Sequence, residues 1–212
     1  MKKSLIIIGA RGFGREAYNA FDSFHRDDDE WIVKGFLDSQ KDILNGYSGY
    51  PPIIGSPETY EIQAEDRFFC AMGDVQWRKH YVDLIASRGG IFTSIISPNC
   101  HIERNSKLGE GCYIDSDVYI SCDINIGDFT YIFRYSVLGH DVEVGHYCHL
   151  GAYSFMGGFS KIEDLATLHP GARVLPHKIV GRQAIVGAGS VVIRNVPANT
   201  TVIGIPAKKI VY

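Results

Sequence analysis

Apolar residues recur at a strict spacing of six through the second half of the chain. The series begins at Ile96 and ends at Val192 without a break. An α-helix repeats about every 3.6 residues and an ordinary strand about every two, so neither explains this period. The apolar positions are Ile96, Ile102, Leu108, Ile114, Ile120, Ile126, Ile132, Leu138, Val144, Leu150, Met156, Ile162, Leu168, Val174, Val180, Val186 and Val192.

A second column lies four residues after each apolar position, where the side chain is usually small or apolar. Glycine often follows the apolar residue directly, which suits a tight corner where the backbone must bend without a Cβ clash. Lys178 interrupts the second column, and the pattern does not explain it. The column comprises Cys100, Ser106, Cys112, Thr130, Ser136, Cys148, Ser154, Ser160, Ala166, Ala172, Ala184 and Ser190.

Three six-residue units would close one triangular coil, and successive coils would stack at the strand spacing of about 4.8 Å. The inward columns would then form one continuous apolar core. We therefore predict a parallel β-helix of about five to six coils over residues 96–212, with a C-terminal extension.

The first part of the chain, residues 1–95, has a different pattern. A continuous apolar run, Leu5–Ile8, is typical of a buried parallel strand, and a glycine-rich loop and a helical pattern follow it. Strand and helix alternate, which predicts a small Rossmann-like βαβ domain. Further strands are expected at 31–38 and 67–73, and a further helix at 78–87.

Glycines after the first strand would let backbone N–H groups and a helix N-terminus approach a phosphate. Asp38 ends the second strand, where such folds place an acid that contacts a ribose or a base. The loop reads G-x-x-G-x-G from Gly9 to Gly14, not G-x-G-x-x-G, which argues against NAD. A plain tight turn is the alternative interpretation.

Charge and composition argue against two classes of partner, nucleic acids and membranes. The net charge of −3 argues against a nucleic-acid-binding surface. The apolar run at the N-terminus is too short for a signal peptide, and no run of about 18 apolar residues predicts a membrane span. Five cysteines are an odd number without zinc-ribbon spacing, so we expect buried free thiols and a cytoplasmic location.

Several motifs together resemble one family, the bacterial sialic acid O-acetyltransferase-like proteins, which includes the UDP-4-amino-sugar N-acetyltransferases. The resemblance implies a left-handed β-helix, a homotrimer, acetyl-CoA in the groove between neighbours, and a nucleotide-sugar against the N-terminal domain. It implies acetyl transfer to the 4-amino group of a UDP-linked amino-deoxy sugar. The motifs are residues 9–14, 35–38, 72–74, 138–141 and 204–208, together with the hexads.

The resemblance also implies roles for individual residues. Asp38 would contact the base, and the phosphate loop would include Gly9, Arg11, Gly12 and Gly14. Phe13 and Phe133 depart from the family pattern, where relatives often have histidine and asparagine. His149 would contact acetyl-CoA or the acceptor.

Further residues are expected to meet acetyl-CoA. Backbone N–H groups near Gly158 and Ala188 would bind the thioester and polarise its carbonyl, and Lys208 would meet the CoA phosphates. Gly204 and Pro206, in the C-terminal motif, would also contact acetyl-CoA.

His140 is the expected general base. An acceptor amine or hydroxyl must lose a proton as it attacks a thioester, and histidine suits this near neutral pH. Asp141 would hold the tautomer of the ring and stabilise the imidazolium. Such a base is worth about 10²–10⁴-fold in rate. No metal is expected.

Three alternatives stay open. One is a zinc enzyme similar to the γ-class carbonic anhydrases, with His140, His146 and His149 as ligands. Another is a non-catalytic binder of nucleotide-sugars. The third is an O-acetyltransferase acting on sialic acid or another glycan hydroxyl, which differs only in its acceptor.

Overall fold

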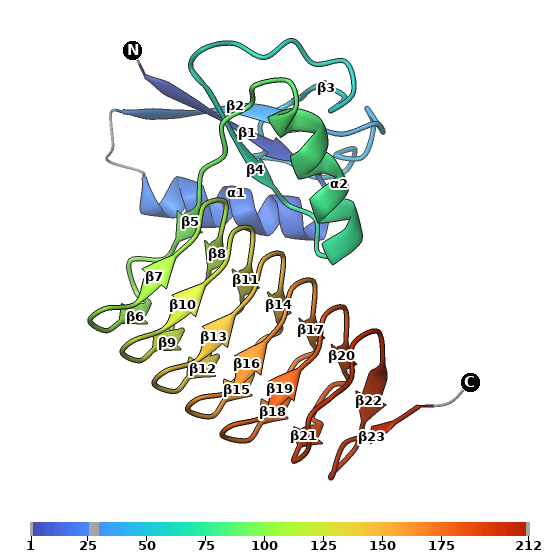
Figure 1. Cartoon of the computed structure of the whole chain (residues 1–212). Coiled ribbons are helices and arrows are strands. Elements are labelled where there is room, and N and C mark those ends of the chain that lie inside the picture. Colours follow the sequence, from blue (N-terminus) through green and yellow to red (C-terminus); the bar gives the residue numbers. More distant parts are fainter. Residues whose placement is uncertain (1, 26–29, 211–212) are drawn as a thin grey trace. The chain divides into compact units, whose positions relative to one another are not determined.

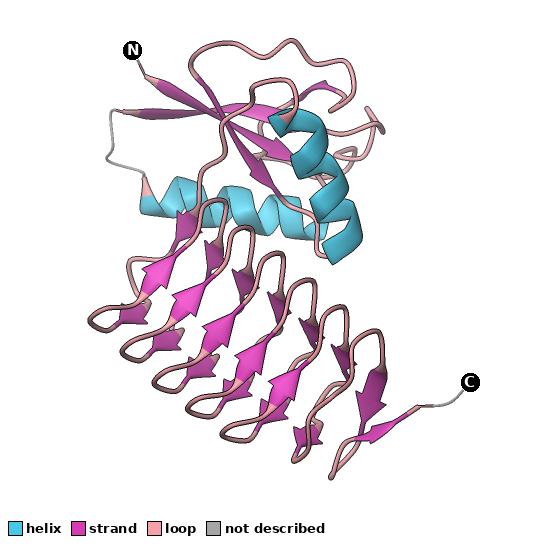
Figure 2. Ribbon diagram, viewed as in Figure 1, coloured by secondary structure: helices cyan, strands magenta, loops and turns pink. Residues whose placement is uncertain are grey.

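The computed structural model describes residues 2–25 and 30–210. The chain forms two compact units, Met1–Ile95 and Ile96–Tyr212. The first contains a parallel sheet and two helices, and the second is a three-sided parallel β-helix (Figures 1 and 2). The predicted fold classes of both parts are confirmed.

The first unit is built on a parallel sheet in the order β3–β2–β1–β4. The central strand is the predicted apolar run, and Leu5 to Ile8 are completely buried in it. The strand expected at 67–73 is β4. The edge strand β3 was not predicted, because it is too short to show a hydrophobic pattern. The elements are β1 (Lys3–Ile8), α1 (Gly12–Phe24), β2 (Trp31–Leu37), β3 (Ile53–Gly55), β4 (Asp66–Cys70) and α2 (Val75–Ala86).

Helix α2 begins three residues before the expected start at Arg78. Its N-cap explains the difference, because the Asp74 carboxylate accepts hydrogen bonds from the N–H groups of Gln76 and Trp77. An aspartate in this place satisfies backbone donors that a helix start otherwise leaves open. The cap therefore puts Trp77 in the first turn of the helix.

Strands β1, β2 and β4 end at one edge of the sheet. Ile8 is in register with Leu37 on one side and with Cys70 on the other. The chain visits β2 and β3 on one side of β1 before it crosses to β4, so this edge is the place where the strand order reverses. Such switch points are where open α/β sheets bind ligands.

The second unit winds through very short strands, each pairing with a strand one coil away. Leu138, for example, is in register with Ile120 and Met156, which are 18 residues distant. One sheet contains β5 (Ile95–Ile96), β8 (Tyr113–Ile114), β11 (Tyr131–Ile132), β14 (His149–Leu150), β17 (Thr167–Leu168), β20 (Ile185–Val186), β22 (Thr201–Ile203) and the antiparallel β23 (Lys208–Lys209).

The other two sheets complete the triangle. One contains β6 (His101–Ile102), β9 (Tyr119–Ile120), β12 (Val137–Leu138), β15 (Phe155–Met156), β18 (Arg173–Val174) and β21 (Val191–Val192). The last contains β7 (Lys107–Leu108), β10 (Asn125–Ile126), β13 (Glu143–Val144), β16 (Lys161–Ile162) and β19 (Ile179–Val180).

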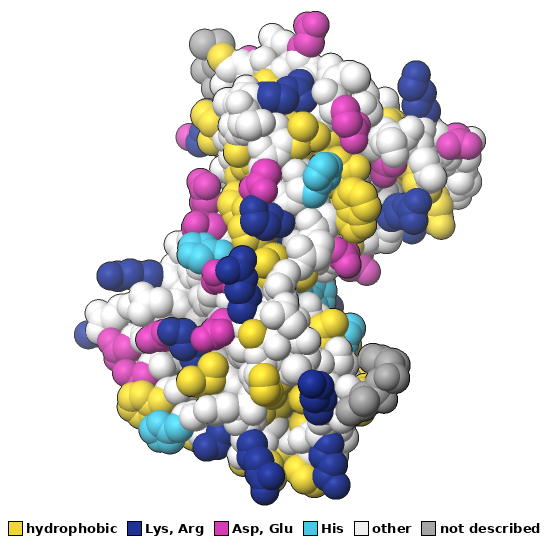
Figure 3. Space-filling model, turned by 45° about the vertical axis from the view of Figure 1, so that its right-hand side comes forward, with side chains coloured by type: hydrophobic (Ala, Val, Ile, Leu, Met, Phe, Trp, Pro, Cys, Tyr) yellow, Lys and Arg dark blue, Asp and Glu magenta, His cyan; other side chains and the backbone are white. Residues whose placement is uncertain are grey.

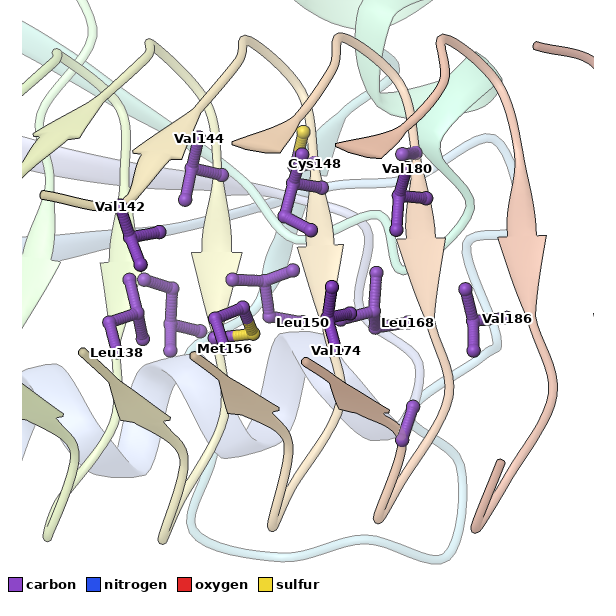
Figure 4. Packing of buried hydrophobic residues seen from close by; sticks show 14 of the residues in the cluster. Leu138, Val142, Val144, Cys148, Leu150, Met156, Leu168, Val174, Val180 and Val186 are labelled. Carbon is purple, nitrogen blue, oxygen red and sulfur yellow. The ribbon is translucent and has the colours of Figure 1, made fainter. Parts of the chain in front are cut away.

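The apolar column fills the interior of the prism. Leu138, Leu150, Leu168 and Val186 are completely buried, and Figure 4 shows their side chains stacked from coil to coil. The first coil differs from the prediction, because Ile96 and Ile102 are exposed. A terminal coil has a neighbouring coil on only one side, so its apolar column is not covered in the same way.

The corners use left-handed backbone at residues that are not glycine. Asp141, Tyr153 and Phe159 have φ near +60°. This costs on the order of 1 kcal/mol each, and the N–H of each such residue donates to the preceding coil, as Asp141 does to the Cys122 carbonyl at 3.2 Å. Repeated coil-to-coil hydrogen bonds therefore hold the corners.

The cysteines are free thiols, as predicted, although their burial is uneven. Cys70, Cys112 and Cys148 are buried, whereas Cys100 and Cys122 are half-buried. Burial raises the pKa of the Cys70 thiol to about 12. Among the described residues, no helix has the length and apolar character needed to cross a membrane.

Candidate active site

The centre of the histidine site is the turn between β12 and β13, at one corner of the β-helix. His140 Nδ1 lies 2.8 Å from Asp141 Oδ2, so the predicted pair forms in the structure. The His140 side chain is 56% exposed. One ring nitrogen is therefore engaged by the carboxylate, and Nε2 is the nitrogen left for a substrate proton.

Gly158 lies one coil further along the same corner, directly against the imidazole. A Cβ on residue 158 would stand 2.8 Å from both Cε1 and Nε2 of His140. Within the described part of the chain, the Gly158 N–H has no hydrogen-bond acceptor. A free backbone donor beside the imidazole is the kind of group that stabilises an oxyanion.

Phe159 also contacts His140, and it was not among the predicted site residues. The two rings are nearly perpendicular, at 86°, with centroids 5.1 Å apart. His177 stacks on Phe159 from the next coil, at 5.0 Å and 3°. Only the 18-residue offset between coils, combined with the position of His140, would have pointed to this ring.

The remaining residues expected to meet acetyl-CoA lie elsewhere on the prism. His149 belongs to β14 on another face, where its ring packs against Phe133 at 4.9 Å. Ala188 follows β20 at a different corner from Gly158. The structure of a single chain therefore does not bring these residues to His140.

The C-terminal motif forms a separate segment. The Gly204 N–H donates to Ser190 Oγ at 3.0 Å, and Pro206 follows a cis peptide bond. Lys208 is exposed in β23, which pairs antiparallel with β22. A cationic side chain is thus available near the last coil, in a different part of the prism from His140.

Within a single chain, the three histidines of the zinc alternative do not come together as a ligand group. His146 lies after β13, where its Nδ1 accepts a hydrogen bond from the Asp128 N–H at 3.0 Å. It lines a shallow hollow of about 410 Å³ whose charges are partly paired, as in the Lys161–Glu143 ion pair at 2.9 Å. No three His, Cys, Asp or Glu residues gather as metal ligands in the described chain.

A cavity of about 300 Å³ lies at the carboxyl edge of the sheet in the first unit. It brings together three predicted residues, Gly9, Arg11 and Asp38. The other lining residues are Leu37, Ser39, Pro57, Ala71, Met72, Trp77 and Tyr81.

The glycine loop is shaped by close packing. A Cβ on residue 14 would overlap the Gly9 carbonyl oxygen, and one on Gly9, where φ is +91°, would meet Met72. Gly12 has open space around its Cα, so packing does not explain that glycine. Arg11 stands at the N-cap of α1 without a side-chain cap hydrogen bond, which leaves backbone donors of the first turn uncapped by that side chain.

Asp38 links the loop to the end of β2. Its Oδ2 accepts the Ala10 N–H at 3.0 Å, and its Oδ1 accepts the Gln40 N–H at 3.0 Å. The carboxylate therefore orders the loop, in addition to the predicted contact with a base. Each oxygen retains a second lone pair that can face the cavity.

An aromatic wall on α2 borders one side of the cavity, and its residues were not among the predicted site residues. Trp77 is 57% exposed, and its ring stacks on Tyr81 at 6.1 Å and 29°. Burial, with Glu58 and Asp38 nearby, raises the pKa of the Tyr81 phenol, which keeps it a hydrogen-bond donor. Hydrophobic side chains lie exposed among charged ones on the face of the molecule that Figure 3 shows.

Comparisons with known proteins agree with this architecture. Residues 4–85 match the PglD N-terminal domain, and residues 123–158 match the bacterial transferase hexapeptide repeats. Fold and repeats together define a hexapeptide-repeat acyltransferase.

Similar proteins show which group of hexapeptide-repeat acyltransferases the chain belongs to. PerB from Caulobacter crescentus, solved with CoA and GDP-perosamine, is 30% identical, with a TM-score of 0.87 over 98% of this chain and 97% of that one. The chain belongs to the family of sugar acetyltransferases that join a PglD N-terminal domain to hexapeptide repeats.

Two curated relatives match over shorter spans. A GDP-perosamine N-acetyltransferase of Escherichia coli O157:H7 is 32% identical over 65% of this chain and 54% of its own length. A serine acetyltransferase of Bacillus licheniformis is 29% identical over 80% of this chain and 68% of its own length. The chain thus spans about half to two thirds of these two curated relatives.

Proposed function

We propose that this protein transfers the acetyl group of acetyl-CoA to the amino group of a nucleotide-linked amino-deoxy sugar. The observation that carries the proposal is the His140–Asp141 pair at 2.8 Å, lying against Gly158 and its free N–H. A base and an oxyanion donor side by side are what acyl transfer from a thioester requires.

The chemistry follows from these positions. His140 Nε2 takes a proton from the acceptor amine as the amine nitrogen attacks the thioester carbonyl carbon. The Gly158 N–H donates to the oxygen that becomes negative, and Asp141 stabilises the imidazolium. The C–S bond then breaks, and the departing CoA sulfur receives the proton from His140.

The nucleotide would lie in the cavity of the first unit. The N-terminus of α1, whose N-cap side chain makes no cap hydrogen bond, and the Arg11 side chain suit a diphosphate, since helix N-termini and cations attract anions. The Trp77–Tyr81 wall suits a base, because aromatic rings stack on nucleobases of any kind. Asp38 remains the proposed hydrogen-bond acceptor for that base.

The nucleotide of the proposed acceptor is GDP. The sequence predicted a UDP-linked sugar, whereas two similar proteins are named for GDP-perosamine. These names favour a GDP-linked acceptor. Acylation of a sialic acid hydroxyl is the second candidate, because the histidine mechanism serves an oxygen acceptor equally well.

We also propose a homotrimer, with acetyl-CoA between neighbouring prisms, and a cytoplasmic location. The sheet that leads into the histidine corner has an outward row of apolar side chains, Tyr119, Val137 and Phe155, each 37–38% exposed. Exposed apolar rows of this kind favour a protein partner. Light scattering coupled to gel filtration measures the number of copies directly.

The decisive experiment is an acetyl transfer assay read by mass spectrometry. The full chain and a His140→Ala variant are incubated with acetyl-CoA and a panel of GDP-, UDP- and dTDP-linked amino sugars and free sialic acids. We expect an acetylated nucleotide-sugar with the wild type and at least about a 100-fold slower reaction with the variant.

Other outcomes would contradict the proposal. Acetylation of sialic acid alone would support the second candidate, and nucleotide-sugar binding without any acetyl transfer would support the non-catalytic binder. Unchanged turnover in His140→Ala would remove the general-base assignment.

A further inference from the structure

We infer that Phe159 is a positioning residue for His140, holding the imidazole in the orientation that acyl transfer needs. The inference rests on the proposed function for its consequence in catalysis. The fixed orientation of the imidazole is inferred from the contacts at this corner alone.

His140 is constrained on several sides. Asp141 holds Nδ1 at 2.8 Å, and Gly158 lies beneath the ring. The Asp141 hydrogen bond opposes a turn of the ring about its Cβ–Cγ bond, but both side chains are exposed to water, at 56% and 43%, so this bond alone holds the ring weakly. Gly158 offers no side chain that could add to it. The Phe159 ring, 5.1 Å away and at 86°, supplies the missing side wall.

Phe159 is itself fixed from both directions. Its N–H donates to the His140 carbonyl at 3.1 Å, and its backbone is left-handed, with φ at +60°. His177 covers the ring from the next coil, and the His177 N–H donates to the Gly158 carbonyl at 3.1 Å. The wall is therefore anchored to the same corner that carries the base.

Burial does not explain the phenylalanine. Its side chain is 51% exposed, and left-handed corners elsewhere carry Asn, Asp and Gln as well as aromatic residues. The corner conformation therefore accepts an aromatic ring but does not require one. Its position against an exposed histidine gives it a role that folding alone does not.

The chain contains a matched control. Tyr153 is also left-handed, at φ +61°, is also exposed, and stacks on Tyr135 at 4.9 Å and 27°. It occupies the corresponding place in the preceding hexad, at a corner that does not carry His140. Loss of either ring removes one exposed aromatic stack from a corner of the prism, so the two substitutions should affect folding similarly.

The test reads the imidazole directly, without an acceptor. Histidine ring nitrogens are observed by NMR in the full chain labelled with ¹⁵N-histidine, at a pH where the rings are neutral, and His140→Ala assigns the signals. We expect wild type, Phe159→Tyr and Tyr153→Ala to show one His140 tautomer, with the proton on Nδ1. Phe159→Ala should let the ring turn away from Asp141, which holds the tautomer, so both His140 nitrogens should move toward the average of two tautomers.

Kinetics test the consequence with acetyl-CoA and GDP-perosamine as the probe acceptor. We expect Phe159→Ala to lower kcat about tenfold, with the KM for acetyl-CoA within about twofold, because misplaced groups cost rate rather than binding. Phe159→Tyr should restore kcat, and Tyr153→Ala should leave it unchanged.

Two results separate the possible failures. A Phe159→Ala spectrum identical to wild type would overturn the positioning role, whatever the kinetics show. A normal rate in His140→Ala would overturn the proposed base, while the spectra would still decide whether Phe159 fixes the ring.

Discussion

The imidazole of His140 occupies the space that a side chain on residue 158 would need. A Cβ there would stand 2.8 Å from Nε2, closer than non-bonded carbon and nitrogen approach. The backbone itself does not demand glycine, because Ala152 and Ala188 hold the same place in their hexads. The glycine at 158 is therefore explained by the histidine.

Gly158→Ala should fold normally and lose activity. The imidazole must move to admit the methyl group, and a displacement of about 1 Å costs up to about 100-fold in rate. We expect kcat to fall 10- to 100-fold, with little change in the thermal unfolding midpoint. Steady-state kinetics and calorimetry measure the two effects, and a variant with unimpaired kcat would contradict the arrangement.

Asp141→Asn should separate the charge of the carboxylate from its shape. Asparagine tolerates the left-handed backbone at φ +57°, so the corner should keep its structure. It cannot stabilise the imidazolium electrostatically, and kcat should fall at least about tenfold. Asp123→Asn, at the same corner one coil earlier, is the control and should leave kcat unchanged.

Trp77→Ala should weaken nucleotide binding to the first unit. Stacking of a base on an aromatic side chain is worth about 1–3 kcal/mol, so the Kd for GDP or UDP should rise about tenfold or more. Tyr47→Ala removes an exposed ring that packs against Arg15 outside the cavity and should leave the Kd unchanged. Isothermal titration calorimetry distinguishes the two variants, and equal affinities would exclude the wall as a base contact.

The variants Ile162→Ala and Ile179→Ala should show that an inward side chain of one sheet stabilises the fold more than an outward one. The first side chain is completely buried, while the second is 37% exposed on the neighbouring strand. A cavity in the core costs about 2–5 kcal/mol in the free energy of unfolding, whereas Ile179→Ala should cost less than about 1 kcal/mol. Urea denaturation followed by circular dichroism gives both values, and similar losses would argue against the inward column.

The period-six pattern predicted the β-helix because each coil repeats the same burial. The reason for the glycines was only partly predicted. Gly139 and Gly151 do avoid a Cβ clash, but the clash is with the backbone of the next coil, near Gly158 and Pro170. Glycine holds some left-handed corners, at residues 111, 171 and 189, but many carry other residues, because coil-to-coil hydrogen bonds offset their strain.

The candidate site was also only partly predicted from the sequence. His140 and Asp141 are adjacent in sequence, so their pairing was predictable, and the glycine loop and Asp38 follow from strand endings. Trp77 and Phe159 were not predicted, because their significance lies in what faces them across the fold. A pattern along the chain does not contain the cavity that α2 borders, and Phe159 is linked to His140 only once three hexads are taken to close one coil of 18 residues.

The 18-residue register makes whole coils the natural unit of change in the second unit. Cys122, His140 and Gly158 stand in one row because each is a full turn from the next. Inserting a single residue would rotate every later inward side chain away from the interior, whereas inserting a complete turn would keep the row aligned. Such a protein can lengthen or shorten by whole turns, and its chemistry can stay in place only if the turns next to the base are left intact.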